Sequence, residues 1–270
     1  MQNIWKAEWR NTMRQHSYYT FLLLWTGVFS LLFLLERSTP QLSGYTNMAG
    51  TIANLILYIL PLLMLIAGSF SISNEFENGQ WRLLCTYPLA ARSYITGKMG
   101  GQFTAQAIVF TFSFGISIIV GLLSGVPLGG RWVIAIYAFS LAVLFFFLLL
   151  GVAMGAFVKT RWQALIVSVV VWFFLIMMWP ILLIGVLNFV PYPMIQPLLQ
   201  AALFLNPAEL VRVIFVVALD GGAVFGQSYD GLVTFFRFGS AWPLLSLYVI
   251  GYALVCIFLS SWKMERRKMQ

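Results

Sequence analysis

Side chains that could do chemistry are few in this sequence, and they form no catalytic pattern. The chain has one histidine, His16, and two cysteines, Cys85 and Cys256. None of the motifs HExxH, paired cysteine clusters, GxSxG and GxxxxGK(S/T) is present. The stretch "YITGKMGG" has a Gly-Lys pair but lacks the upstream glycine and the following Ser or Thr of a phosphate-binding loop. We therefore expect no catalytic residue, no metal site and no cofactor in this chain, so energy for any work must come from another protein.

The polar residues gather instead in one segment, residues 75–98, between two long apolar stretches. Gly79 can end a helix that leaves the membrane. "QWRLLCTY" then predicts a short amphipathic helix, with Trp81, Leu84 and Pro88 on one side at spacing i, i+3, i+7. Pro88 cannot continue that helix but is tolerated in the first turn of the next. Such a helix could dock into a partner protein; a plain connecting loop is the alternative.

The elements that carry this segment are membrane helices. The chain is 61% hydrophobic and 9% charged, against about 25% charged in an ordinary soluble domain. A spanning helix needs about 20 predominantly apolar residues, and alternating patterns typical of barrel strands are absent. We therefore predict an all-α polytopic membrane protein, a single domain over 1–270, with six spans at 18–35, 52–73, 99–126, 132–158, 164–187 and 243–262.

Positive charges set the expected orientation. With both termini cytoplasmic, twelve of the sixteen Lys and Arg residues lie on the cytoplasmic side, where positive charge is retained. The net charge of +8 is explained by this topology, and no aromatic-interleaved basic face indicates a nucleic-acid partner. We predict a multi-pass protein of the cell membrane, plasma or inner, in contact with lipids.

Residues 1–17 predict a helix that lies in the inner membrane interface. Ile4, Trp5, Trp9 and Met13 recur near helical spacing beside basic residues, which combines an apolar and a basic face. A solvated tail is the alternative. The apolar run that follows ends in "ERSTP" without a small-residue cleavage site, so we expect a retained membrane helix and not a secretion signal.

Small residues and prolines indicate how the spans pack. Pro61 and Pro180 predict kinks in the second and fifth spans, either structural or used as hinges. Close approach between helices is expected where glycines lie four residues apart: Gly97 with Gly101, Gly121 with Gly125, and Gly151 with Gly155.

The segment 75–98 resembles the signature of ABC-2 type transporter permeases. The similarity rests on Glu77-x-Gly79, Leu83-Leu84, "TYPLAAR" and Gly97-Lys98, in this order. It implies that the segment is a coupling helix seated in a groove of a separate ATPase, which binds ATP and Mg²⁺. It also implies two permeases, as a homodimer, and two ATPases in one transporter. The residues expected to couple are Glu75, Glu77, Gly79, Trp81, Leu84, Tyr87, Pro88 and Arg92.

The outer stretch 188–242 carries a narrower similarity. Asn206-Pro207, Glu209 and Arg212 in "LFLNPAELVRVIFVV" look like a phrase in the permeases of nitrous-oxide-reductase maturation systems, as does "TYPL". We expect these four residues to contact an extracytoplasmic partner or to form a gate. Residues 210–219 are too short to span and predict an outer-leaflet or re-entrant helix, which either caps the pathway or packs over the spans.

Two roles follow for such a permease, and a third is disfavoured. The first is export of a drug, an antibiotic peptide or a lipid-like substrate, giving resistance or self-immunity. The second is extracytoplasmic work such as copper-enzyme maturation. An intramembrane enzyme lacks any catalytic set. The sequence does not identify the substrate.

Overall fold

The computed structural model describes residues 2–14, 16–38, 48–86, 90–125, 129–219, 221, 230–237 and 241–268. Over these residues the regular structure is helical throughout, as predicted. In chain order the helices are α1 (Gln2–Arg14), α2 (His16–Ser38), α3 (Met48–Glu77), α4 (Gln80–Cys85), α5 (Ala91–Leu123), α6 (Gly130–Gly155), α7 (Arg161–Trp172), the π-helix η1 (Phe173–Met178), α8 (Trp179–Leu187), α9 (Tyr192–Leu205), α10 (Pro207–Ala218), α11 (Asp230–Arg237) and α12 (Ala241–Lys268).

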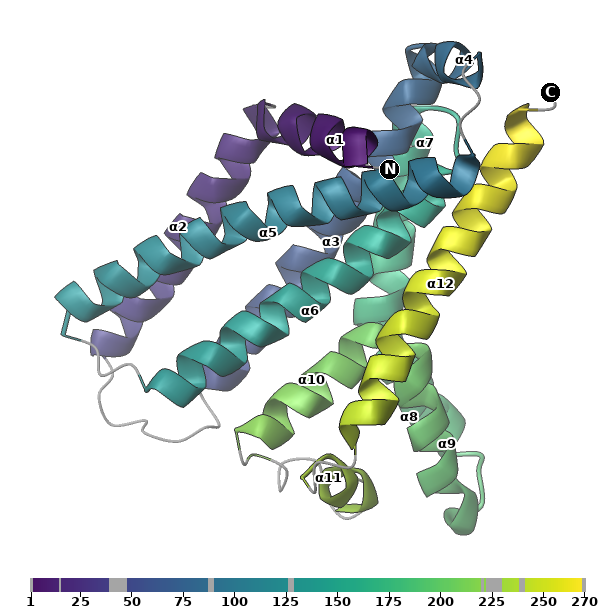
Figure 1. Ribbon diagram of the computed structural model, residues 1–270. Helices are drawn as coiled ribbons and strands as arrows, with labels where there is room; N and C mark the ends of the chain where they lie inside the picture. The colour runs from purple at the N-terminus through teal and green to yellow at the C-terminus, as the bar shows by residue number, and fades with distance from the viewer. Residues whose placement is uncertain are drawn as a thin grey trace.

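Long apolar helices form the body of the molecule (Figure 1). Five are long and apolar enough to span a membrane: Gly50–Glu77, Ala91–Leu123, Gly130–Gly155, Arg161–Leu187 and Pro243–Lys268. Two bent pairs, α1 with α2 and α9 with α10, raise the count to seven if each is one span. A multi-pass membrane protein is therefore confirmed, and the predicted six spans fall within the range of five to seven.

The two ends of the bundle carry different elements. In Figure 1, α1, α4 and the C-terminal end of α12 lie at one end, which we name the α4 end. The helix α11 and the turn between α8 and α9 lie at the other, which we name the α11 end.

Small residues bring α3 and α6 into backbone contact. A Cβ atom added at Gly151 would lie 2.7 Å from the carbonyl oxygen of Leu65, and one at Gly155 would lie 2.6 Å from that of Ser69. Only a residue without a side chain fits at these positions, so the predicted close approach at Gly151 and Gly155 is confirmed. The prediction is wrong for Gly125, whose added Cβ would contact nothing. Gly125 has a φ of +79° and follows the end of α5.

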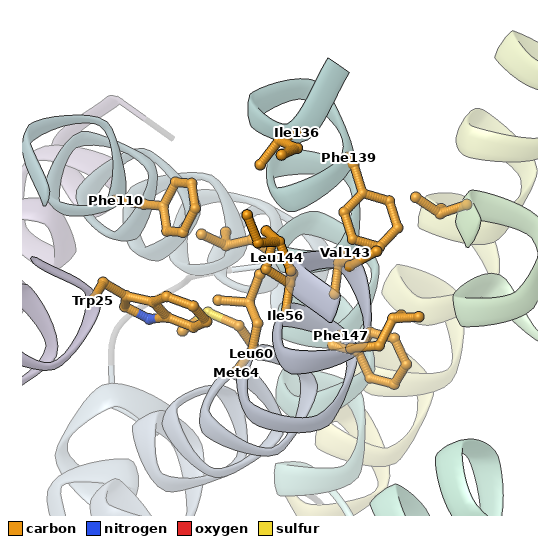
Figure 2. Close-up of a cluster of buried hydrophobic side chains, with 14 of the residues drawn as sticks. Trp25, Ile56, Leu60, Met64, Phe110, Ile136, Phe139, Val143, Leu144 and Phe147 are labelled. Carbon is orange, nitrogen blue, oxygen red and sulfur yellow. The ribbon is translucent and has the colours of Figure 1, made fainter. Parts of the chain in front are cut away.

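Aromatic and aliphatic side chains fill the space between α2, α3, α5 and α6 (Figure 2). Trp25 of α2 is fully buried, and its ring centroid lies 5.5 Å from that of Phe110 on α5. Phe139 of α6 packs at 4.7 Å from Phe215 of α10. This packing holds α10 against the bundle, where it lies over the spans.

The two prolines have different effects. The helix α3 continues through Pro61. The fifth predicted span is interrupted, because α7 widens into the π-helix η1 before α8 begins with Pro180 in its first turn. A π-helical segment therefore precedes Pro180 in the span where a kink was predicted.

Candidate functional site at the α4 end

The short helix α4 leaves the bundle at a glycine turn. Gly79 has a φ of +70°, and its N–H donates to the carbonyl oxygen of Phe76 at 3.3 Å. Any residue with a Cβ is strained in this left-handed conformation, so glycine is required for α4 to turn away from α3. The short helix predicted between 75 and 98 is therefore present, over Gln80–Cys85.

The side chains of α4 divide between an inward and an outward face. Trp81 is 7% exposed and packs against the rings of Phe76 and Tyr94, with centroid distances of 5.6 and 5.7 Å. Leu84 is half-buried beside the same cluster, whereas Leu83 is 68% exposed. Trp81, expected from the sequence to couple to the ATPase, instead packs inward and fixes the position of α4 on the bundle. Among the described side chains of α4, Leu83 is the large apolar one that faces outward. Tyr87 and Pro88 lie outside the described residues.

A buried lysine, Lys98, lies about one helical turn along α5 from Tyr94, the residue that Trp81 packs against. The Nζ of Lys98, on α5, is 2.6 Å from Glu75 Oε1 on α3 and 3.1 Å from Glu8 Oε2 on α1. The Lys98 side chain is 2% exposed, and Tyr94 donates its hydroxyl proton to the second oxygen of Glu75. The helices α1, α3 and α5 are therefore joined by one cluster, which we name the Lys98 cluster: Glu8, Glu75, Tyr94 and Lys98.

The charges of the Lys98 cluster do not balance. Burial raises the pKa of Glu8 above its usual 4.5; Lys98 opposes this shift, and the nearby Glu75 carboxylate adds to it. Desolvation is the main cause of the raised pKa of Glu8, and the second carboxylate, which shares the same ammonium group, adds to it. The cluster therefore carries an excess of negative charge when both carboxylates are ionised.

Sequence reasoning found Glu75 but missed Glu8, Tyr94 and Lys98 as its partners. A signal was present. Tyr94, Lys98, Gln102 and Gln106 recur every four residues along α5, which places polar side chains on one face of an apolar helix. The sequence did not indicate which distant residue they meet.

The remaining predicted coupling residues lie at the surface of the same end. Glu77 Oε2 accepts from the backbone N–H of Arg161 at 2.8 Å, and the Glu77 and Arg161 side chains are 43% and 47% exposed. Asn74 accepts from the guanidinium of Arg161. These contacts tie the end of α3 to the start of α7, although so exposed an ion pair contributes little stability. Arg92 is exposed in the first turn of α5.

A sharp bend separates α9 from α10, whose axes differ by 109°. At this bend and just after it lie the four residues that were expected to contact an extracytoplasmic partner or to form a gate: Asn206, Pro207, Glu209 and Arg212. Asn206 is fully buried: its Oδ1 accepts from the N–H of Ala208 at 3.0 Å, and its Nδ2 donates to the carbonyl oxygen of Leu175 at 2.7 Å. In a π-helix that carbonyl would accept from the residue five positions later, which is Pro180 and has no N–H. Asn206 therefore supplies the hydrogen bond that Pro180 cannot.

Pro207, Glu209 and Arg212 lie in the first turns of α10. Pro207 is the first residue of that helix, where its missing N–H costs nothing. Arg212 Nη2 pairs with Glu209 Oε2 at 2.6 Å, with side chains 35% and 15% exposed. These residues lie near the Asn206 bend, well separated along the chain from the Lys98 cluster. Among the described residues, no group of three or more His, Cys, Asp or Glu side chains could hold a metal ion.

Comparison with known proteins gives a family and two relatives. The family described as "ABC-2 family transporter protein" matches residues 2–269. The chain is 28% identical over 191 residues to a "Probable ABC transporter permease protein NosY" of Stutzerimonas stutzeri, which covers 68% of this chain and 69% of the relative. It is 29% identical over 195 residues to a protein with the same description from Pseudomonas aeruginosa, with coverage of 68% and 69%.

Proposed function

The chain belongs to the ABC-2 family of transporter proteins, and from this premise we propose that it is a permease subunit that couples ATP hydrolysis by a separate ATPase to work across the membrane. That ATPase binds ATP and Mg²⁺, because this chain has no phosphate-binding loop. Two permeases and two ATPases form the transporter, in the cell membrane, with both termini and α4 in the cytoplasm.

The observation that carries this proposal is the construction of α4. A short helix stands off the bundle on the Gly79 turn, is anchored inward by Trp81, and turns Leu83 outward. An exposed leucine on a helix whose other face is fixed is suited to a groove in a partner, since a few large apolar side chains carry most of the energy of an interface. Leu83, Leu84 and Arg92 are the residues that we place nearest to the ATPase.

Motion of α4 has a defined route into the membrane helices. Trp81 contacts Phe76 on α3 and Tyr94 on α5. Tyr94 and Lys98 both bind Glu75, and Lys98 also binds Glu8 on α1. Separating these helices would leave a buried charge unpaired, at a cost of about 3–5 kcal/mol. The ATPase therefore moves α1, α3, α4 and the start of α5 as one unit.

Two roles remain for the transporter. One is export of a drug, an antibiotic peptide or a lipid-like substrate. The other is work on an extracytoplasmic accessory protein during maturation of a copper enzyme such as nitrous oxide reductase, and the similarity to two permeases named NosY favours it. In this second role, Asn206, Pro207, Glu209 and Arg212 set the shape of the α9–α10 bend that such a partner or gate would use.

The test is binding of the co-expressed ATPase to the full-length permease and to its variants. Leu83→Ala should weaken binding by about 30-fold, which corresponds to a hot spot worth about 2 kcal/mol. Leu123→Ala is the matched control, because Leu123 is also an exposed leucine, 84% exposed, at the last residue of α5. The permease alone should show no ATPase activity. Unchanged ATPase binding and coupled activity in a folded Leu83→Ala variant would show that α4 is not the coupling element.

A further inference from the structure

The outward face of α1 carries a row of positive charges. Lys6, Arg10 and Arg14 are all exposed, and their spacing of four residues places them on one side of the helix. We name these three residues the α1 stripe. The other exposed positions in the described part of α1 are Ala7 and Asn11, so this face offers cations and no large apolar side chain. The coupling role described above does not use it.

The opposite face of α1 is used within the protein. A Cβ added at Gly100 would lie 3.3 Å from the ring of Trp5, and one at Gly101 would lie 2.7 Å from the carbonyl oxygen of Trp5. Glu8 is the one acidic residue in the sequence of α1, and its Oε2 lies 3.1 Å from Lys98 Nζ on α5. Packing on α5 therefore uses the apolar side and the negative charge of α1 and leaves its positive charges outside.

The charges of the α1 stripe are not balanced within the chain. Among the described residues, no carboxylate pairs with Lys6, Arg10 or Arg14. Like charges four residues apart on a helix repel one another. Negative charge supplied from outside this chain, along the stripe, would offset that repulsion.

The direction of α1 keeps the three cations at one depth. The axis of α1 is bent by 65° from that of α2, the apolar helix that follows. Lys6 and Arg14 are about 12 Å apart along α1, which amounts to about 5 Å along the axis of α2. The headgroup layer of a bilayer is about 5–8 Å thick on each side of the hydrocarbon core, so all three cations fit within it.

Exposed aromatic side chains mark the same level. Tyr19 lies in the first turn of α2, Trp162 in the first turn of α7 and Trp262 near the C-terminal end of α12, and all three are exposed. These helix ends lie at the α4 end of the bundle, as α1 does (Figure 1). Because Tyr and Trp gather where a membrane meets water, the surroundings of the α1 stripe are lipid headgroups.

We propose that the α1 stripe binds anionic lipid headgroups, of the phosphatidylglycerol type, in the leaflet at the α4 end. A headgroup phosphate accepts charge-assisted hydrogen bonds from Lys and Arg. Phosphatidylglycerol carries a net negative charge, whereas the choline of phosphatidylcholine adds a cation that the stripe repels. Bound lipid would hold α1 on the start of α5, where Glu8 meets Lys98. The proposal concerns this chain alone and holds whether or not α4 couples to an ATPase.

The experiment is lipid binding to the purified full-length permease without its ATPase, measured by native mass spectrometry. Phosphatidylglycerol should bind about tenfold more tightly than phosphatidylcholine with the same acyl chains, since one anionic headgroup meets one or two cations that contribute about fivefold each. Glycerol phosphate, which has a similar charge without the tails, should not displace the lipid. In bilayer discs, phosphatidylglycerol should also slow amide hydrogen exchange in α1 several-fold relative to phosphatidylcholine, and about 1 M salt should remove the difference.

Variants locate the site. Arg10→Gln should reduce the preference for phosphatidylglycerol about fivefold, and Arg10→Lys should keep most of it. Lys159→Gln, at an exposed lysine after α6, is the matched control and should leave it unchanged. The triple variant Lys6→Gln/Arg10→Gln/Arg14→Gln should lose the preference; if it fails to fold, Arg10→Gln carries the test.

Four results would each overturn the proposal. They are equal binding of the two lipids, displacement of the lipid by glycerol phosphate, a full preference retained in the folded stripe variants, and an equal loss in Lys159→Gln. If the triple variant lost binding of the ATPase and kept its preference for phosphatidylglycerol, the stripe would belong to a protein interface, and the proposal would be wrong.

Discussion

At the scale of single residues, Lys98 lies in buried surroundings that are unfavourable for a lysine without an ion-pair partner. A lysine ammonium is almost never fully buried unless it is paired. Here it is held by Glu75 at 2.6 Å and by Glu8 at 3.1 Å. The ion pairs do not by themselves make the fold stable, since desolvation offsets much of their attraction. They do require that α1, α3 and α5 stay together.

The prediction at this scale is that Lys98→Met destabilises the permease strongly, by about 3 kcal/mol, because two largely desolvated carboxylates then face each other without a cation. Adding Glu8→Gln and Glu75→Gln should restore most of the loss, since a neutral cluster has no unpaired charge. Lys159→Met, at an exposed lysine, is the control and should change little. Denaturant unfolding in detergent measures all three; a Lys98→Met variant as stable as the control would contradict this account of the cluster.

Sequence reasoning reached part of this cluster, and the reason for its limit is physical. The spacing of Tyr94, Lys98, Gln102 and Gln106 is local and can be read along one helix. The partner Glu8 is ninety positions away from Lys98, and its contact depends on how α1 lies across α5. A Cβ added at Gly101 would lie 2.7 Å from the carbonyl oxygen of Trp5. The helix α1 therefore packs closely against α5 at a position where α5 has no side chain.

At the scale of elements, the sequence predicted best the helices and turns that are determined by residues close to one another in the chain. The turn at Gly79 and the short helix after it follow from glycine and from amphipathic spacing, and the long apolar helices follow from composition. The α9–α10 bend was expected only as a short outer-leaflet or re-entrant helix over 210–219. Its geometry depends on Asn206 reaching Leu175, a contact between distant parts of the chain.

The prediction at this scale concerns Asn206. Asn206→Ala removes the cap of α10, worth about 1 kcal/mol, and takes the side-chain donor from the partly buried carbonyl of Leu175, at about 1 kcal/mol more. Asn206→Ser keeps a side-chain oxygen that can accept from Ala208 and should lose less stability. The free energy of unfolding in detergent should therefore be highest for the wild type, lower for Asn206→Ser and lowest for Asn206→Ala. Equal stability of the three proteins would mean that this residue does not hold the bend.

At the scale of the whole molecule, contacts at the α4 end extend to the C-terminal helix. Besides the Lys98 cluster, Arg267 of α12 donates to the carbonyl oxygens of Val158 and Phe157, at 2.9 and 3.0 Å, and lies 4.3 Å from the ring of Phe76. The ends of α3, α6 and α12 are thereby fixed near α4. A force applied at α4 would therefore reach α12 as well as α1, α3 and α5.

The α4 end also collects the positive charge from which we infer its cytoplasmic position. The prediction is tested with paired single cysteines in a background of Cys85→Ser and Cys256→Ser: Leu83→Cys on α4, at a position 68% exposed, and Phe189→Cys after α8, at a position 91% exposed. A membrane-impermeant thiol reagent should label Phe189→Cys in intact cells and Leu83→Cys only after permeabilisation. Neither position is covered by protein, and labelling of both cysteines in detergent is the control, so a difference in labelling of intact cells reports sidedness and not burial. The reverse pattern would invert the orientation and place the proposed ATPase contact on the wrong side of the membrane.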